Sequence, residues 1–218
     1  DENSINFAGG YNGTASFDTI AWIHGTKSFY GFQVDGELSV TDIYAFDTQA
    51  YTDALVTTVP VEVMEPFVDE LGQLFALTFD GGGAALSFID VTAGTVTQLA
   101  SVPLTSKLGY DPVTRNIYRA DGNPEVSVAT LPAVIDVMSP PTLSFTTVPG
   151  APACSGPADN ISVSHDGSTL IVGCGTSQSL YAWDLNQQTS SFVNNLGPIL
   201  GQNPMVDLQA NIDGSYAY

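Results

Sequence analysis

Few side chains in this sequence could do chemistry: there are two histidines, two cysteines and a large excess of carboxylates. His165 stands in an Asp-Gly turn, which predicts a solvent-facing turn residue. His24 follows an expected inner strand, where packing at the strand end is favoured over a place in a central channel. Neither a Gly-x-Ser-x-Gly elbow nor a His-Glu-x-x-His motif occurs. The sequence therefore predicts no catalytic residue and favours a non-enzymatic protein.

Cys154 and Cys174 form an even pair, twenty residues apart. Two sequons, Asn12-Gly13-Thr14 and Asn160-Ile161-Ser162, predict glycosylation at Asn12 and Asn160. Together with the scarcity of lysine, these features favour an oxidising, extracellular setting and a Cys154–Cys174 disulfide. Closing a loop of this length would stabilise the fold by about 3 kcal/mol. Because the chain begins at Asp1 without a methionine or leader, we expect a mature, secreted protein.

The charge balance excludes two classes of partner. The chain carries 23 acidic and 4 basic residues, a net charge of −19. Nucleic acid is excluded because too little positive charge is present to displace counterions from phosphates. Anionic membrane surfaces repel such a chain, and no apolar run is long enough for membrane insertion. Other protein subunits, including further copies of this chain, and glycans remain as expected partners.

Apolar segments that end in aspartate recur at a regular interval. Their aspartates are 43, 46 and 48 residues apart. The segments are Ile43–Asp47, Leu86–Asp90, Ala133–Asp136 and Leu180–Asp184. An interval of this size is typical of propeller blades. Each aspartate should end a strand and accept hydrogen bonds from amides of the following turn.

A second marker, a proline after each of these segments, recurs at nearly the same intervals as the aspartates. The prolines are Pro60, Pro103, Pro149 and Pro198, spaced by 43, 46 and 49 residues. Proline cannot donate to a strand ladder, so each should stand where the outermost strand stops. Neither an immunoglobulin-like sandwich nor a jelly roll predicts two markers in step. The fold class predicted is all-β, a β-propeller of four-stranded antiparallel blades.

The predicted propeller domain, residues 19–218, contains four full repeats and a partial fifth. The blades span about 19–60, 61–103, 104–149 and 150–198, and the fifth repeat begins at 199. Strands are expected at Ile20–Ile23, Phe29–Phe32, Leu74–Phe79 and Asn116–Arg119. The third blade should carry a longer insertion at Gly122–Pro132. The apolar spacing of two predicts no amphipathic helix.

Residues 1–18 match no complete repeat, and three ways of closing the propeller remain open. In the first, which the sequence slightly favours, the chain continues past Tyr218 and forms six to eight blades. In the second, residues 1–18 supply the missing strands of a five-bladed ring. In the third, the ring is open and another subunit covers its edge, for which residues 1–18 could be an exchanged strand.

Several segments resemble known secreted propeller repeats. Asp166-Gly-Ser-Thr-Leu-Ile-Val-Gly173, followed by Leu180-Tyr-Ala-Trp-Asp-Leu185, resembles the "YVTN" surface-layer and lactonase-like propellers. Trp183-Asp184 is similar to the end of a WD40-type repeat, although no Gly-His partner occurs. The resemblance covers most of residues 19–218 at the level of the repeat pattern. It implies the fold and an extracellular location but no activity, because propellers host many functions.

The lactonase-like resemblance also implies a place for a metal ion. Such propellers hold a divalent metal in the channel with carboxylate and amide oxygens, a ligand set that suits Ca²⁺. The main candidates are Asp69, Asp159 and Asp207, with Glu70, Asn160 and Asn203 as further candidates. A glycosylated Asn160 could not be a buried ligand. The leading expectation is therefore that no cofactor is bound, with Ca²⁺ as the alternative.

Three functions follow from these observations. The first is a secreted, glycosylated propeller that acts as a structural, adhesive or self-assembling module without enzymatic activity. The second is a Ca²⁺-dependent hydrolase of the lactonase or esterase type. The third is a glycan-binding lectin, for which aromatic side chains would supply a stacking surface unless they pack between blades. The aromatic candidates are Tyr11, Tyr30, Phe32, Tyr51, Tyr110, Tyr118 and Tyr181.

Overall fold

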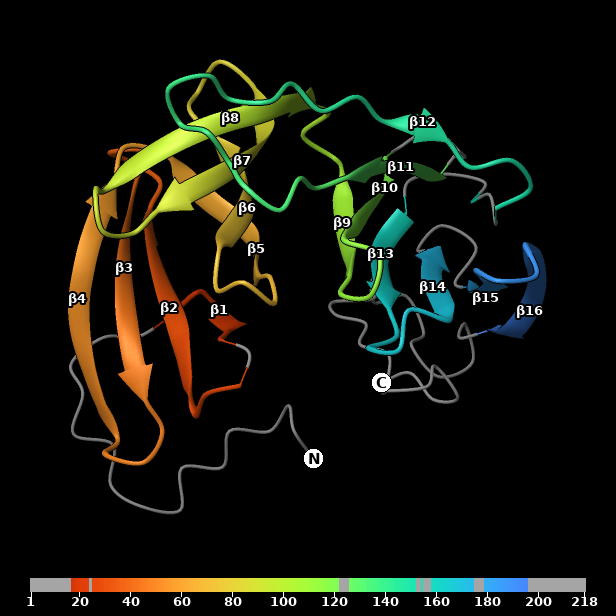
Figure 1. Ribbon diagram of the computed structural model, residues 1–218, viewed down its shortest axis with the longest axis horizontal. Helices are drawn as coiled ribbons and strands as arrows, with labels where there is room; N and C mark the ends of the chain where they lie inside the picture. The colour runs from red at the N-terminus through yellow and green to blue at the C-terminus, as the bar shows by residue number, and fades with distance from the viewer. Residues whose placement is uncertain are drawn as a thin grey trace. The chain divides into compact units, whose positions relative to one another are not determined.

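The computed structural model describes residues 17–23, 25–121, 126–151, 154, 158–174 and 179–195, without the side chains of 158, 159 and 190–195. These residues form strands and turns without a helix, so none of them belongs to a helix that could cross a membrane. Their strands make four antiparallel sheets of four strands each, as the repeats predict (Figure 1). The chain divides into two compact units, Asp1–Gln98 and Leu99–Tyr218, which are described separately.

The first sheet has the order β1-β2-β3-β4. Its strands are β1 (Thr19–Trp22), β2 (Ser28–Asp35), β3 (Val40–Asp47) and β4 (Thr52–Val59). On one face, Phe29 of β2 stacks on Phe46 of β3 with ring centroids 4.6 Å apart. The ring of Phe17 covers Gly31 so closely that a Cβ there would lie 2.5 Å from it. Only glycine permits this contact, which explains the break in the apolar alternation of β2.

The second sheet has the order β5-β6-β7-β8. Its strands are β5 (Glu62–Val68), β6 (Leu74–Phe79), β7 (Ala84–Asp90) and β8 (Thr95–Val102). Strand β6 has the predicted bounds, and the Asp80–Gly83 turn follows it. Asp80 accepts hydrogen bonds from the amides of Gly82 and Gly83, which lower the pKa of its carboxyl. In the sheet interior the hydroxyls of Thr78 and Ser87 form a hydrogen bond with their oxygens 2.7 Å apart, so each buried hydroxyl has a partner.

The core of the first unit lies between its two sheets, where β5 lies against β1. Phe32 and Ile43 pair across β2 and β3 and are fully buried on this face. Val63, Leu74 and Ile89 of the second sheet belong to the same cluster. Truncating a buried phenylalanine to alanine costs about 3–5 kcal/mol, so Phe32 contributes substantially to the stability of the unit.

The third sheet has the order β12-β11-β10-β9. Its strands are β9 (Lys107–Asp111), β10 (Asn116–Ala120), β11 (Val126–Thr130) and the two-residue β12 (Thr146–Thr147). Strand β10 confirms the predicted strand at Asn116–Arg119, and a turn that follows Asp111 joins β9 to β10.

Two predictions for the third repeat were wrong. Ala133–Asp136 is not a strand, and Gly122–Pro132 is not the insertion, because β11 lies inside it. The long irregular segment is instead residues 131–145, here called the strap. Pro132, Pro140 and Pro141 remove three backbone donors from the strap, which prevents a regular ladder there. Strand β11 has the alternating burial that the apolar run in the strap lacks.

The fourth sheet has the order β13-β14-β15-β16. Its strands are β13 (Ala158–Val163), β14 (Thr169–Cys174), β15 (Ser179–Asp184) and β16 (Thr189–Asn195). The predicted disulfide joins Cys154 to Cys174, with the two Cα atoms 5.3 Å apart. Both cysteines are buried in the core cluster between β10 and β14, together with Leu170 and Trp183. The disulfide therefore fixes the loop before β13 to the end of β14.

Each repeated aspartate forms the predicted turn. Oδ1 of Asp47 accepts from the amides of Gln49 and Ala50, at 2.7 and 3.1 Å. The same pair of bonds, to the second and third following amides, recurs at Asp90, Asp136 and Asp184. Asp136 keeps this turn although no strand precedes it. Pro60 and Pro103 directly follow β4 and β8, as expected, whereas Pro198 lies outside the described residues.

Candidate functional site

The predicted metal ligands do not form a site within the described part of the chain. Asp69 is fully buried, but its Oδ1 accepts from the amides of Leu71 and Gln73, at 2.9 and 2.7 Å. It therefore holds the turn between β5 and β6, while Glu70 beside it is exposed. The described residues contain no group of three or more His, Cys, Asp or Glu side chains that could hold a metal ion. The side chain of Asp159, and Asn203 and Asp207 entirely, lie outside these residues. The Ca²⁺ site stays a prediction.

The sequon at Asn160 lies in β13, opposite Gly173 of β14. Asn160 is only 9% exposed, and its Oδ1 accepts from the amide of Ile161 at 2.8 Å. A glycan needs a side chain that reaches solvent, so this burial argues against modification at Asn160. Asn12 and His24 lie outside the described residues, and His165 is an exposed turn residue, as predicted.

The aromatic residues considered for glycan stacking are mostly packed. Phe32 and Tyr118 are buried, and Tyr30, Tyr110 and Tyr181 are partly buried. Burial raises the pKa of the Tyr30 and Tyr118 hydroxyls, which is the expected effect of desolvating a phenolate. Tyr51 is exposed, and Tyr11 lies outside the described residues. The described aromatic residues therefore contribute mainly to packing.

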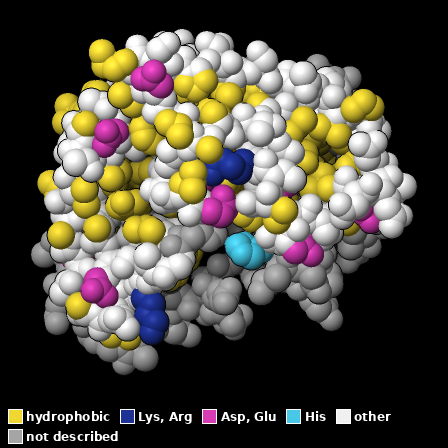
Figure 2. Space-filling view, in the orientation of Figure 1, with side chains coloured by type: hydrophobic (Ala, Val, Ile, Leu, Met, Phe, Trp, Pro, Cys, Tyr) yellow, Lys and Arg dark blue, Asp and Glu magenta, His cyan; other side chains and the backbone are white. Residues whose placement is uncertain are grey.

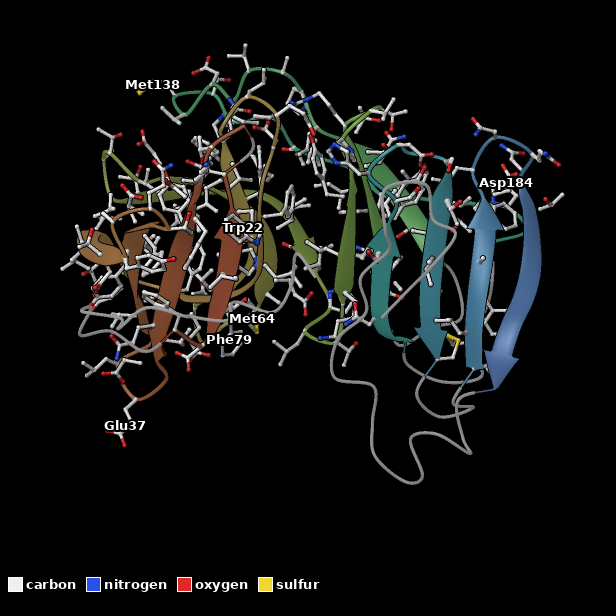
Figure 3. All side chains as sticks on the ribbon, turned by 90° about the horizontal axis from the view of Figure 1, so that it is seen from below. Trp22, Glu37, Met64, Phe79, Met138 and Asp184 are labelled. Atoms are coloured by element: carbon white, nitrogen blue, oxygen red, sulfur yellow. A yellow bond between two sulfur atoms is a disulfide. The ribbon has the colours of Figure 1, made fainter. Side chains whose placement is uncertain are left out.

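A hollow of about 630 Å³ lies beside the turn between β2 and β3. It is lined by Gln33, Val34, Asp35, Gly36, Glu37, Leu38, Val40 and Asp42. Oδ1 of Asp35 accepts from the amides of Glu37 and Leu38, and Oδ1 of Asp42 accepts from the Thr58 hydroxyl at 2.5 Å. Figure 3 shows Glu37 at the tip of this hairpin. Asp35 thus stabilises the turn between β2 and β3, and Asp42 joins β3 to β4.

The strap presents the most exposed apolar side chains of the described residues. Val134 is 76% exposed, Val137 48% and Met138 90%. Figure 3 shows Met138 pointing away from the ribbon. Three apolar side chains within five residues are therefore exposed together, and this set is here called the strap patch. Sequence reasoning missed this patch, because Ala133–Asp136 has the apolar pattern of a buried strand.

The strap is anchored at both ends. At its start, the Arg115 guanidinium donates to the carbonyls of Leu131 and Pro132, at 3.4 and 3.1 Å. At its end, the amide of Leu143 donates to the carbonyl of Leu99 in β8 at 2.8 Å. The Arg119 guanidinium lies 4.4 Å from the centre of the Phe145 ring, a cation–π contact. These anchors hold the apolar side chains in a fixed loop.

Neither a protein-family profile nor a curated protein sequence matches the chain. Solved structures match its fold. One, from a nidogen/laminin complex, gives a TM-score of 0.58 at 12% identity over 87% of this chain and 66% of that one. Another is an oligogalacturonate lyase in complex with manganese, with a TM-score of 0.57 at 11% identity over 82% and 53%. The β-propeller domain of the trilobed protease from Pyrococcus furiosus gives 0.55 at 12% identity over 90% and 60%.

These likenesses and the four successive four-stranded sheets identify the fold. The chain is a β-propeller protein, as the two sequence markers predict. It spans 53% to 66% of the lengths of these structures. At 11% to 12% identity the likeness establishes the fold alone.

Proposed function

We propose that this chain is a secreted propeller that acts as a non-enzymatic, protein-binding structural or adhesive module, with the strap as its contact surface. The observation that carries the proposal is the exposure of Val134, Val137 and Met138 on an anchored loop. Burying such side chains against a partner yields about 25 cal/mol for each Å² of apolar surface. A loop already fixed in position loses little conformational entropy on binding.

Two further observations support an extracellular protein partner. The disulfide between Cys154 and Cys174 suits an oxidising compartment. One structurally similar protein was solved in a nidogen/laminin complex, so a related fold takes part in a protein assembly there. The net charge of −19 favours a partner with a basic surface around its apolar contact.

The experiment compares two variants on an array of extracellular proteins. The strap variant carries Val134→Asp and Met138→Asp. The control carries Leu104→Asp, which adds one negative charge at another exposed apolar residue of the second unit. If both strap residues are central contacts, affinity for the bound protein should fall by more than about 30-fold, whereas the control should bind like the unchanged protein. Equal binding by both variants, or no bound protein at all, would contradict the proposal.

A metal-dependent hydrolase is the second candidate function. The fold likeness to an oligogalacturonate lyase solved with manganese favours a bound metal, and the fold likeness to a puromycin hydrolase favours hydrolysis. Asp207 is the ligand to test, because the carboxylate of Asp69 already holds a turn. Metal analysis of the purified protein, followed by Ca²⁺ titration of the Asp207→Ala variant, decides this case. If the unchanged protein binds one equivalent of Ca²⁺ and the Asp207→Ala variant binds none, the hydrolase is favoured over the binding module.

A further inference from the structure

Strand β4 forms an outer edge of the first sheet that is open to solvent. It is eight residues long and stands last in the order β1-β2-β3-β4 (Figure 1). Leu55 is 54% exposed and Val56 41%, and Figure 2 shows hydrophobic side chains at the surface in this region. Among the described residues, no strand pairs with β4 on the side away from β3. Unpaired amides and carbonyls on a long edge are a template for another strand.

In β8, the carbonyl of Leu99 accepts a hydrogen bond from the amide of Leu143 in the strap. The turn at Gly94 approaches β4, where a Cβ on Gly94 would lie 2.6 Å from the Thr57 hydroxyl oxygen and 3.8 Å from the Thr58 carbonyl oxygen. Strand β4 contains no lysine or proline, since Pro60 follows only after its end, so Asp53 and a central bulge are the features that protect this edge.

A bulge lies at the apolar centre of β4. Tyr44 and Ile43 of β3 pair with Leu55 and Thr57, so Val56 is an extra residue. The bulge therefore leaves Leu55 and Val56 adjacent and exposed at the middle of the edge.

We propose that β4 pairs antiparallel with β4 of a second copy of this chain. A register centred between Leu55 and Val56 places Leu55 opposite Val56 of the second copy. The same register places Asp53 opposite Thr58, so the acidic side chains of the two strands do not face each other. Like charges directly opposite would destabilise the pair, whereas apolar and charge–hydroxyl pairs do not. The strand is thus complementary to itself.

The charge of the chain gives this pairing a distinctive salt dependence. Two copies with net charge −19 repel each other, and salt screens that repulsion. The dimer should therefore tighten as ionic strength rises. A basic partner strand on the same edge would show the opposite trend, and weaker binding in salt would overturn the proposal.

The first test measures the oligomeric state by sedimentation velocity over a wide concentration range at low and high salt. The unchanged protein should dimerise, and Leu55→Asp or Val56→Asp should weaken the dimer by more than about tenfold, since each change occurs twice in a symmetric interface. Leu71→Asp alters an exposed leucine of the first unit outside β4 and should leave the dimer intact. The strap variant should also dimerise, which separates this inference from the proposed function. A monomer at every concentration, or a dimer that the β4 variants retain, would overturn it.

The second test examines the register. Directly opposed residues in antiparallel strands have Cα atoms about 4.5–5.5 Å apart, within reach of a disulfide. A mixture of the Leu55→Cys and Val56→Cys variants should form an intermolecular disulfide faster than either variant alone. Equal rates in all three samples would contradict this register.

Discussion

Single aspartates and glycines define the turns of this protein. Asp166 accepts from the hydroxyl of Ser164 at 2.7 Å and from the amide of Ser168 at 3.0 Å. The turn it closes lies against the turn between β9 and β10, where Asp111 is buried. The next residue, Gly167, has a φ of 70° and leaves no space for a side chain.

Replacing Ser164 by alanine should raise the pKa of Asp166. The bond from the Ser164 hydroxyl is the main cause that lowers this pKa, with the Ser168 amide and hydroxyl as further causes. The pKa of Asp166 is lower in the folded protein than in the unfolded chain, where an aspartate has a pKa of about 3.9. The carboxylate therefore stabilises the fold above the unfolded-state pKa, and this stabilisation is lost as the pH falls through the folded-state pKa. The variant should be less stable than the unchanged protein at pH 7, and the part of this loss that comes from Asp166 should disappear in acid, where Asp166 is protonated. An NMR titration of Asp166 checks the shift, and an unchanged pKa would contradict this prediction.

Gly167→Ala should destabilise the protein more than Gly72→Ala. A Cβ at Gly167 would lie 2.6 Å from Oδ1 of Asp111, whereas one at Gly72 meets nothing within 4 Å. Both glycines have a positive φ, so Gly72→Ala isolates the backbone cost of about 1 kcal/mol. We expect Gly167→Ala to cost about 1–3 kcal/mol more. Urea denaturation of both variants measures the difference, and equal losses would mean that the turns do not pack as described.

At the scale of elements, the third sheet differs most from the sequence prediction. Its third strand, β11, is short, and the apolar run that keeps the repeat spacing lies in the strap. The aspartate marker is retained because the Asx turn at Asp136 is local and needs no preceding strand.

A pair of proline substitutions tests this assignment. Ala129 pairs with Ile117 in the ladder between β11 and β10, so Ala129→Pro should cost about 3 kcal/mol or more. Val134 has no ladder partner among the described strands, so Val134→Pro should change stability by less than about 1 kcal/mol. Thermal unfolding of the two variants compares them directly. A larger loss for Val134→Pro would restore Ala133–Asp136 as a strand.

At the scale of the whole molecule, net charge limits stability. The chain carries −19 with only 4 basic residues, so most of its 23 carboxylates have no cation to pair with, and Arg119 pairs with Asp121 at 3.1 Å. Repulsion among the remaining carboxylates opposes the compact state.

Raising the salt concentration should therefore stabilise the protein. If screening relieves about 1 kcal/mol of repulsion, Tm should rise by about 2–4 °C for a chain of this size. Calorimetry in dilute buffer and in about 0.5 M NaCl measures this, and the use of both NaCl and KCl controls for specific ion effects. A Tm that falls with salt would show that favourable ion pairs dominate.

The sequence by itself determined the fold class, most strands and the turn chemistry of this protein. Asx turns at Asp47, Asp90 and Asp184, and the strand Leu74–Phe79, depend on neighbouring residues, so their signals are local. The Cys154–Cys174 pair was the only pairing that two cysteines allow.

Only the tertiary structure decided which apolar residues are buried. Val134 and Met138 have the same chemistry as Val126 and Leu131, yet the first two are exposed and the last two buried. The position of the strap depends on hydrogen bonds to Arg115 and Leu99. Both residues are distant from the strap in sequence, so no local pattern predicts these bonds. The burial of Asn160 likewise depends on which strands become neighbours, because burial is a property of the packed sheet and not of the segment. The position of β4 at the edge of its sheet has the same origin.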